Sequence, residues 1–327
     1  MVHRYLELID VADRRGALAL VADLAAAGVS VETLVLELLA PAQREVGVRW
    51  ERRQCTVAQE HAATAITDAA LALVTLDDIA SPLGHVLVGC VEGEWHLMAA
   101  RMAAEIFRER GWATTFLGPS VPAVDLAAYV AATRPDAVAL SCSLAILLPG
   151  AQRCILACRE KDVPVLAGGA GFASDGRYAV ALGASAWAED PVAGVGHLES
   201  LLDAPLPRRQ PRRRPDDENR MLEASHAELL SEAFQRLAPR VAPTVDVATV
   251  LAGLDMVLAA VESATLVGDS MLLSASTAMI ERVMPENDSS AFGFAAILEG
   301  LLPSLRQRSS RAADVVEQAI PAVVRRH

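Results

Sequence analysis

The chain is poor in the residues on which several covalently bound cofactors depend. Of its 327 residues only Lys161 is a lysine, so a Schiff base with retinal or pyridoxal phosphate has a single candidate site. No cysteine follows Cys158, which excludes a thioether-linked chromophore in the last third of the chain. Four further cysteines are scattered without metal-ligand spacing, at Cys55, Cys90, Cys142 and Cys154. We therefore expect buried free thiols in a reducing compartment.

Long apolar runs and an excess of positive charge are missing as well. No run approaches about 18 uninterrupted apolar residues, and the N-terminus lacks a signal-peptide pattern, so we expect a cytoplasmic protein without a membrane segment. The formal net charge of −12 disfavours a protein whose main task is to bind nucleic-acid phosphates. Charged residues are 21% and hydrophobic residues 53% of the chain, which is typical of globular domains. The length allows two or three such domains.

Residues 1–80 have the apolar periodicity of a four-helix bundle. Breaks between helices are predicted at Gly16, at Gly28 with the N-cap candidate Ser30 two residues later, and at Pro41. Two helices are expected after the last break, with a short turn between them.

The sequence on either side of this turn predicts that three side chains lie close together. Trp50 ends one helix, and Glu60 and His61 stand in the first turns of the next. These residues can meet across the turn. The alternative is that Trp50 packs inside the bundle and His61 bonds to the backbone.

Residues 81–203 alternate short apolar runs with helical segments, which predicts a flavodoxin-like α/β domain with a parallel sheet. The expected strands are His85–Val91, Ala113–Leu117, Ala137–Ser141, Val163–Ala167 and Ala184–Trp187. The expected helices are Leu97–Arg110, Pro122–Arg134, Leu148–Lys161, Asp175–Leu182 and Pro191–Leu202. Five strands at this spacing fit the order 2-1-3-4-5, in which ligands bind near strands one and three.

Polar side chains and glycines follow three of these strands. Glu94 and His96 follow the first strand, the stretch 141–144 ends the third, and Gly168-Gly169 ends the fourth. An imidazole whose second nitrogen is held by an acid is the usual arrangement for a metal ligand, and a bare glycine lets a ligand approach the backbone. The alternatives are a solvated His96 without a ligand, or FMN. For FMN the first loop lacks a Ser/Thr/Gly phosphate cradle.

Residues 204–217 are rich in proline and arginine, which predicts an exposed linker. Residues 218–327 are expected to form an all-helical domain. Its helices are predicted at Asn219–Leu237, Val247–Val267, Ser270–Val283, Ala291–Leu305 and Ala312–Val324.

The loop motifs together resemble those of the cobalamin-binding fold. Glu94-x-His96-x-x-Ala99, Ser141-x-Ser143-Leu144 and Gly168-Gly169 are similar to its D/E-x-H-x-x-G, S-x-L/T and GG elements. The resemblance implies that His96 is the lower axial ligand of cobalt. The displaced dimethylbenzimidazole tail of cobalamin would enter a slot floored by the serine loop and the glycine turn. Ala99 departs from the pattern, which has glycine there, and adds one methyl group near the tail.

The helical bundle resembles the cap that covers the upper corrin face in the same proteins. Trp50 with Glu60-His61 is similar to the W-x9-E-H signature of CarH-type adenosylcobalamin photoreceptors, in which the Trp and Glu shape a pocket for the 5′-deoxyadenosyl group. Trp95 and Val57 are assigned to the same cofactor site.

Two departures from the CarH type modify this expectation. The chain starts at the bundle instead of a winged-helix domain, and Glu51 stands where CarH proteins supply the His that captures cobalt after photolysis. Direct DNA binding is therefore not expected, and a bis-His photoproduct would need His61 or another residue. A homo-oligomer, dimer or tetramer, is the expected assembly.

The domain order resembles that of photocobilins, which pair adenosylcobalamin with a bilin in a globin-like C-terminal domain. This implies biliverdin bound without a covalent link. Candidate residues for its propionates and pyrrole nitrogens are Arg220, Arg236, Arg240, Arg282 and His226.

The sequence thus favours a light sensor, and not an enzyme, that binds adenosylcobalamin through His96 and with it biliverdin. One alternative is a corrinoid methyl-carrier subunit of a methyltransferase system. Another is a cofactor-binding regulatory scaffold without photochemistry.

Overall fold

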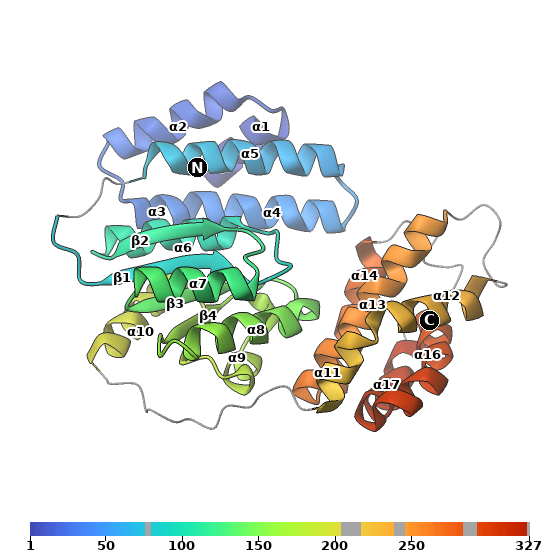
Figure 1. The fold of residues 1–327 in the computed structure, drawn as a ribbon. Coiled ribbons are helices and arrows are strands. Elements are labelled where there is room, and N and C mark those ends of the chain that lie inside the picture. The colour runs from blue at the N-terminus through green and yellow to red at the C-terminus, as the bar shows by residue number, and fades with distance from the viewer. Residues whose placement is uncertain (76–79, 204–216, 239–245, 284–292, 326–327) are drawn as a thin grey trace. The chain divides into compact units, whose positions relative to one another are not determined.

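The structure is a computed structural model that describes residues 1–75, 80–203, 217–238, 246–283 and 293–325 (Figure 1). The chain forms two compact units. Unit 1 comprises residues 1–141, 157–169 and 184–208, and unit 2 comprises residues 142–156, 170–183 and 209–327. The expected linker 204–217 lies, except for its last residue, outside the described residues.

Unit 1 begins with a cap of four helical rods, as predicted. Its elements are α1 (Val2–Asp10), α2 (Arg14–Ala26), α3 (Val31–Leu34), η1 (Val35–Leu39), α4 (Ala40–Glu51) and α5 (Val57–Leu73). The break near Gly28 is confirmed, because Ser30 caps α3 by accepting a hydrogen bond from the backbone N–H of Thr33. At α5 a capping box of Thr56 and Gln59 starts the helix.

The predicted breaks at Gly16 and Pro41 are wrong. Gly16 lies in the first turn of α2, where its N–H donates to the capping carboxylate of Asp13 at 2.9 Å, and a side chain there would collide with that cap. Pro41 is the second residue of α4, and the helix is continuous from residue 31 to 51. Proline lacks an N–H and crowds the preceding turn. The wide π-helical turn η1 absorbs this crowding, so the helix does not break.

The sheet of unit 1 has the predicted order, β2-β1-β3-β4-β5, with all strands parallel. The strands are β1 (His85–Cys90), β2 (Ala113–Gly118), β3 (Ala137–Ser141), β4 (Val165–Gly168) and β5 (Ala186–Ala188). The helices that follow them are α6 (Met98–Glu109), α7 (Ala123–Thr133), α8 (Leu148–Arg159), α9 (Arg177–Leu182) and α10 (Pro191–Asp203). Two short 3-10 turns, η2 (Ala145–Leu147) and η3 (Ala170–Phe172), belong to the stretches grouped with unit 2.

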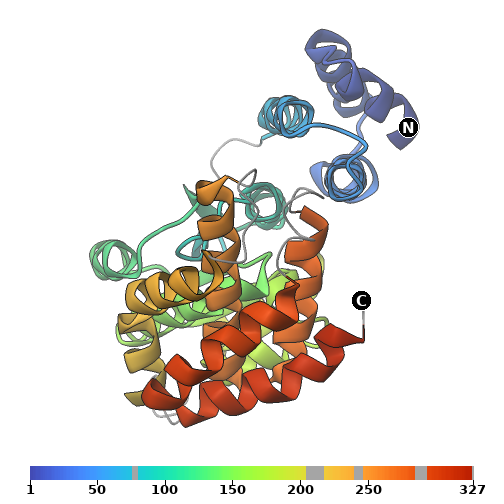
Figure 2. The ribbon, with the colours of Figure 1, turned by 90° about the vertical axis from the view of Figure 1, so that its right-hand side faces the viewer.

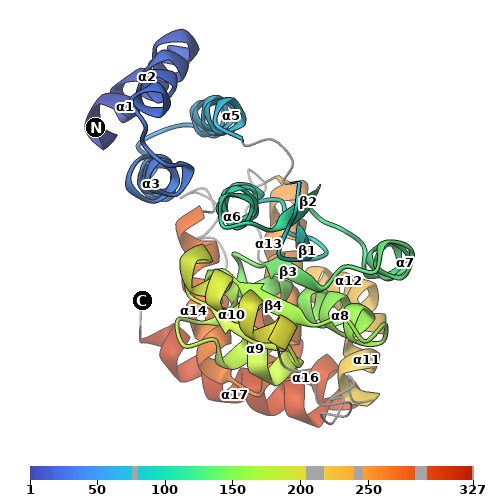
Figure 3. The ribbon, with the colours of Figure 1, turned by 90° about the vertical axis from the view of Figure 1, so that its left-hand side faces the viewer.

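Helix α6 joins the cap to the sheet, and it contacts α3 and α5 on one side and β1 and β2 on the other (Figures 2 and 3). The carboxylate of Glu109 accepts hydrogen bonds from the backbone N–H groups of Val31 at 2.8 Å and Glu32 at 2.6 Å. A carboxylate at the N-terminus of a helix is favoured by the unpaired N–H groups there. One apolar core runs from Tyr5 in the cap to Leu166 in β4. Cap and sheet therefore fold as one body.

Unit 2 is helical, and its two inserted stretches carry most of α8 and all of α9. Its other helices are α11 (Asp217–Ala224), α12 (His226–Leu237), α13 (Val247–Val267), α14 (Ser270–Val283), α16 (Phe294–Arg308) and α17 (Ser310–Val324). The all-helical prediction is confirmed, but the single helix expected over 219–237 is two. The N–H of Ser225 bonds to the carbonyls of both Met221 and Leu222, and the chain turns before α12 begins.

Helix α13 forms the centre of unit 2 and contacts α11, α12, α14 and α17. It is the one described helix that is long and apolar enough to cross a membrane, and 61% of its most apolar window is buried within the protein. A central helix contacts other helices on several sides and is therefore apolar around most of its circumference, which accounts for this composition.

Candidate cofactor-binding site

The loop after β1 holds a buried carboxylate against an exposed imidazole. Oε1 of Glu94 accepts hydrogen bonds from Nδ1 of His96 at 2.6 Å and from its backbone N–H at 2.9 Å. The Glu94 side chain is fully buried, whereas 63% of the His96 side chain is exposed. The chain positions Glu94 through its backbone carbonyl, which accepts from the N–H of Ser120. Within the described residues, Nε2 of His96 has no hydrogen-bond partner.

This geometry fixes the tautomer of the imidazole. With Nδ1–H donated to Glu94, the lone pair of Nε2 faces outward, as a metal ligand requires. The hydrogen bond to Glu94 raises the pKa of His96, burial opposes the increase, and the charge of Glu60 adds to it. Burial, with the charge of Glu94, raises the pKa of the Cys90 thiol to about 12, so this neighbour stays protonated and does not compete as a ligand.

Glu60 is held within electrostatic range of His96 by a relay of polar side chains. The amide of Gln43 in α4 donates to Oγ1 of Thr64 at 2.5 Å, and Thr64 donates to Oε1 of Glu60 at 2.7 Å. Nδ1 of His61 lies 2.5 Å from the other oxygen, Oε2. The relay ties α4 to α5 and leaves little freedom to the Glu60 carboxylate. Gln43 and Thr64 were missed in the sequence, although Thr64 stands one helical turn after Glu60, where side chains meet.

The turn between α4 and α5 carries the other predicted residues of the cap. Trp50 is half-buried in the last turn of α4, and the Val57 side chain, at the start of α5, is exposed. Arg49 bonds to Asp10 at 2.6 Å and to Glu45 at 2.8 Å, which anchors the end of α4 to α1. Trp95, in the loop before His96, is 71% exposed.

The carboxyl ends of three strands lie at one edge of the sheet. Ser141 of β3 pairs with Cys90 of β1 and with Gly168 of β4, and its carbonyl accepts from the N–H of Val91 at 3.0 Å. Gly169 has φ of +102°, in the region that favours glycine, so its identity is required by the backbone. At Gly168 a side chain would meet only ordinary contacts, so the structure itself does not demand glycine there.

The serine loop of unit 2 is packed against the chain that follows the glycine turn. Gly171 donates its N–H to the carbonyl of Cys142 at 2.9 Å, and a side chain on Gly171 would collide with Cys142 and with the backbone of Leu144. Ser143 and Leu144 are half-buried. Ala99, the departure from the glycine of the motif, is exposed in the first turn of α6, where a methyl group has space.

The residues predicted for biliverdin lie in unit 2. His226 bonds through Nδ1 to Glu262 at 2.7 Å and through Nε2 to Asp255 at 2.9 Å. Arg236 donates to the carbonyl of Gly300 and to Ser304. Arg282 donates to the carbonyl of Ala278, Arg220 is exposed on α11, and Arg240 lies outside the described residues. None of these hydrogen bonds joins one candidate to another.

Residues 84–195 match a family described as B12 binding domain, and residues 1–75 match a second family with the same description. The chain belongs to the B12-binding proteins over these residues. One relative of this B12-binding protein is the HTH-type transcriptional repressor CarH of Myxococcus xanthus, 43% identical over 108 residues, which are 32% of this chain and 35% of CarH. The repressor CarA of the same organism is 34% identical over 112 residues, 34% of this chain and 37% of CarA. The B12-binding chain thus spans little more than a third of these relatives.

Corrinoid proteins are also similar to this B12-binding protein. Dimethylamine corrinoid protein 1 of Methanosarcina acetivorans is 26% identical over 172 residues, which are 50% of this chain and 80% of that protein. The monomethylamine corrinoid protein of Methanosarcina barkeri has a similar fold, with a TM-score of 0.52 and 19% identity over 60% of this chain and 96% of that structure. This likeness concerns the fold alone.

The donor chemistry of the site fits cobalamin. Within the described residues no group of three or more His, Cys, Asp or Glu is arranged to hold a metal ion. A single outward-facing imidazole on a buried carboxylate suits a metal whose other positions are filled by a macrocycle.

Proposed function

We propose that this B12-binding protein is a light sensor that holds 5′-deoxyadenosylcobalamin through Nε2 of His96. The observation that carries the proposal is the Glu60 carboxylate, one part of the W-x9-E-H signature, fixed by Thr64 and His61 within electrostatic range of His96. A rigid carboxylate on the cap side is suited to a ribose hydroxyl, because a charged acceptor forms the stronger kind of hydrogen bond. A carrier that must open to a partner enzyme has no need of such a fixed group.

The residues take distinct roles in this proposal. His96 ligates cobalt, and Glu94 orients the ring. Trp50, Val57, Glu60 and His61 face the adenosyl group from the cap, and Trp95 covers the edge of the corrin. Ser141, Ser143, Leu144, Gly168 and Gly169 receive the nucleotide tail.

Bound adenosylcobalamin supplies a Co–C bond that light cleaves. When the adenosyl group leaves, the cap loses its contacts through Trp50 and Glu60. A loss of about 3 kcal/mol in differential contacts would shift a two-state equilibrium by about two orders of magnitude. The output in this proposal is a changed homo-oligomer, dimer or tetramer, in the cytoplasm, without direct DNA binding, as the net charge of −12 supports.

The test is an absorbance spectrum of the protein with adenosylcobalamin in darkness and after green light, together with its mass by light scattering. We expect a His-ligated spectrum that changes on illumination and a change in mass. His96→Ala should abolish the His-ligated spectrum. A wild-type protein that stays colourless would support a regulatory scaffold without photochemistry.

The second candidate is a corrinoid methyl carrier. It is favoured by the similarity to Dimethylamine corrinoid protein 1, which extends over 80% of that protein. With the help of a partner enzyme, a carrier would accept the methyl group of a methylated amine on its reduced cobalt. Retention of methylcobalamin in preference to adenosylcobalamin would decide for the carrier.

Biliverdin as a second, non-covalent chromophore belongs to the same proposal. It rests on the order of domains and on arginines of unit 2 such as Arg236. His226 would have to exchange at least one carboxylate partner to reach a pyrrole nitrogen, because both ring nitrogens are engaged. Biliverdin titration of wild type and of Arg236→Gln tests it, and an unchanged biliverdin spectrum on adding wild type would contradict it.

A further inference from the structure

We propose that the C-terminal helices are part of the tail-binding half of the cobalamin site, and that Tyr178 and Asp269 are its positioning residues. The inference rests on cobalamin binding with a displaced tail, as in the proposed function, and extends that site to a region that neither family match covers. The first observation is the composition of unit 2, which groups residues 142–156 and 170–183 with residues 209–327. These two stretches directly follow β3 and β4 in the chain, where the serine loop and the glycine turn lie.

The two stretches are joined to each other. The N–H of Gly171 donates to the carbonyl of Cys142, and the absence of a side chain on Gly171 permits this approach. The Cys142 thiol in turn donates to the carbonyl of Leu144 at 3.4 Å. A shift of the stretch 170–183 therefore moves the serine loop with it.

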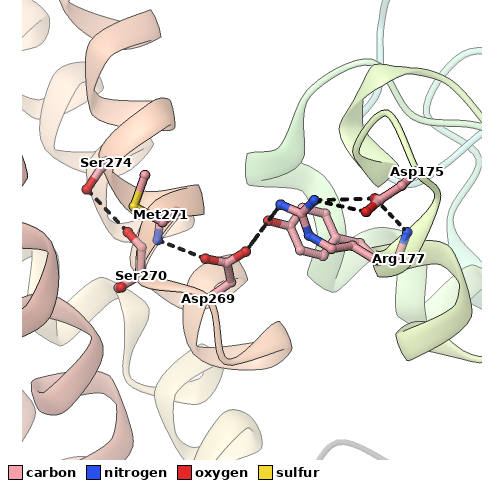
Figure 4. A network of polar contacts seen from close by, with 7 residues as sticks. Asp175, Arg177, Asp269, Ser270, Met271 and Ser274 are labelled. Carbon is pink, nitrogen blue, oxygen red and sulfur yellow. Dashed lines mark hydrogen bonds and ion pairs between the residues drawn. The ribbon is translucent and has the colours of Figure 1, made fainter.

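The same stretch is fastened by Tyr178 to Asp269, the residue before α14 and 91 positions later in the chain. Figure 4 shows Asp269 facing Arg177 of this stretch. The Tyr178 hydroxyl donates to Oδ2 of Asp269 at 2.7 Å, and Nη2 of Arg177 lies 3.4 Å from the same oxygen. Asp175 holds the guanidinium of Arg177 from the other side, at 3.3 Å. The Arg177 guanidinium also stacks 4.7 Å from the centre of the Tyr178 ring. We call this group of four residues the latch.

Asp269 is firmly placed, because it also caps a helix. Its Oδ1 accepts from the backbone N–H of Met271 at 2.9 Å, in the first turn of α14. Burial opposes the ionisation of Asp269, but the hydrogen bonds from Tyr178 and Met271, together with the charge and hydrogen bond of Arg177, outweigh it and lower the pKa of the carboxyl. Burial raises the pKa of Tyr178 to about 12, so the hydroxyl keeps its proton. A charged acceptor and a protonated donor make the strong kind of hydrogen bond.

A second contact also joins one of these stretches to the C-terminal helices. Nη1 of Arg153 in α8 lies 2.6 Å from Oε2 of Glu223 in α11. The short turn η2, directly after Leu144, contacts α13 and α14, and α9 contacts α13. The stretches after β3 and β4 thus have their packing partners in the C-terminal helices, and their positions depend on those helices.

The consequence is selective for the nucleotide tail. Loosening the latch frees Ser143 and Leu144, the tail-receiving residues that belong to unit 2, whereas His96 and Glu60 belong to unit 1. Cobinamide, which has the corrin ring but no nucleotide tail, should therefore bind equally well to wild type and to a latch variant. Cobalamin should not.

The experiment compares the dissociation constants of adenosylcobalamin and adenosylcobinamide in darkness, by absorbance titration of the full chain. The variants are Tyr178→Phe and Asp269→Asn, and the control is Arg306→Gln, which breaks an exposed ion pair with Glu317 within the same helices. We expect each latch variant to lose about fivefold in affinity for the cobalamin, since a hydrogen bond to a charged group is lost, and less than about twofold for the cobinamide. The control should change neither constant.

A latch variant that binds both compounds like wild type, or that loses both to the same extent, would overturn the inference. If Tyr178→Phe fails to fold, as circular dichroism would show, Asp269→Asn and Arg177→Gln carry the test. If wild type binds both compounds and the latch variants lose neither or both to the same extent, the latch alone is rejected. The proposed function then still stands. Wild type that binds neither compound would reject both.

Discussion

Oε1 of Glu94 lies 2.6 Å from Nδ1 of His96 and also accepts the backbone N–H of that residue, so one buried oxygen sets both the ring and the loop that carries it. A buried carboxylate is stable only when paired, and here its partner is the proposed ligand itself. The pair therefore stabilises the loop and orients Nε2 at the same time.

Replacing this carboxylate should weaken cofactor binding without removing the ligand. We expect Glu94→Gln to reduce cobalamin affinity about 10- to 100-fold, because partners of a ligating His have effects of this size. Glu92→Gln in the same loop is the control and should stay close to wild type. Dissociation constants from absorbance titration measure the effect, and equal affinities of Glu94→Gln and wild type would contradict the assigned role.

The relay through Thr64 predicts a different effect, on the identity of the upper ligand. Thr64→Val removes the hydroxyl that fixes Glu60, and we expect about a threefold to tenfold loss of affinity for adenosylcobalamin with little change for methylcobalamin. Thr133→Val removes an exposed hydroxyl that bonds to the carbonyl of Tyr129 and is the matched control. Equal losses for both cobalamins would show that Thr64 supports the fold alone.

The contact of Glu109 with the start of α3 predicts local protection of two amides. Glu109→Gln loses the charge that the helix N-terminus favours, which costs about 1 kcal/mol. We expect the N–H groups of Val31 and Glu32 to exchange with solvent about fivefold faster, while those of α13 keep their rates. Hydrogen exchange read by NMR or mass spectrometry checks this, and unchanged rates at residues 31 and 32 would refute the tie.

The His226 cluster predicts a pH-dependent stability of the C-terminal helices. The hydrogen bond to Glu262 has the largest effect on the pKa of His226, and the contact with Asp255 adds to it. Together they raise this pKa from 6.5 to about 9, against the effect of burial. Because the folded pKa is the higher one, the stabilisation is fully present below about pH 6.5 and is lost as pH rises through about 9.

The measurement is amide exchange in α12 and α13 between pH 6 and pH 10, corrected for intrinsic rates. His226→Gln should flatten the loss of protection with pH, and it should be less stable than wild type at pH 6 by about 1 to 3 kcal/mol. His3→Gln, at an exposed ion pair in α1, is the control. A wild-type profile as flat as that of the variant would contradict the cluster.

The strands and their order could be predicted because each is a short apolar run between helical segments, and the register of Cys90, Ser141 and Gly168 follows from that order. The orientation of His96 could also be expected, since Glu94 is two residues away. These features depend on local sequence and on general rules of parallel sheets.

The features that could not be predicted depend on partners distant in sequence or on compensation within a helix. Pro41 is a helix breaker by its chemistry, and only the π turn before it shows how the helix continues. The bond from Tyr178 to Asp269 spans 91 residues, and nothing near either residue indicates the other. The position of Glu60 depends in the same way on Gln43, from a different helix.

The uninterrupted rod from Val31 to Glu51 has a mechanical consequence. It is tied to α6 at its first residues by Glu109, and it carries Trp50 at its far end, a lever of about 30 Å for 21 residues. A swing of about 5° about that fulcrum, in which α1 moved with the far end to which Arg49 ties it, would displace the tip by about 2.5 Å, close to half a helical turn. In the proposed light response, the loss of a group beside Trp50 would thus be amplified along a rod that the π turn η1 keeps continuous.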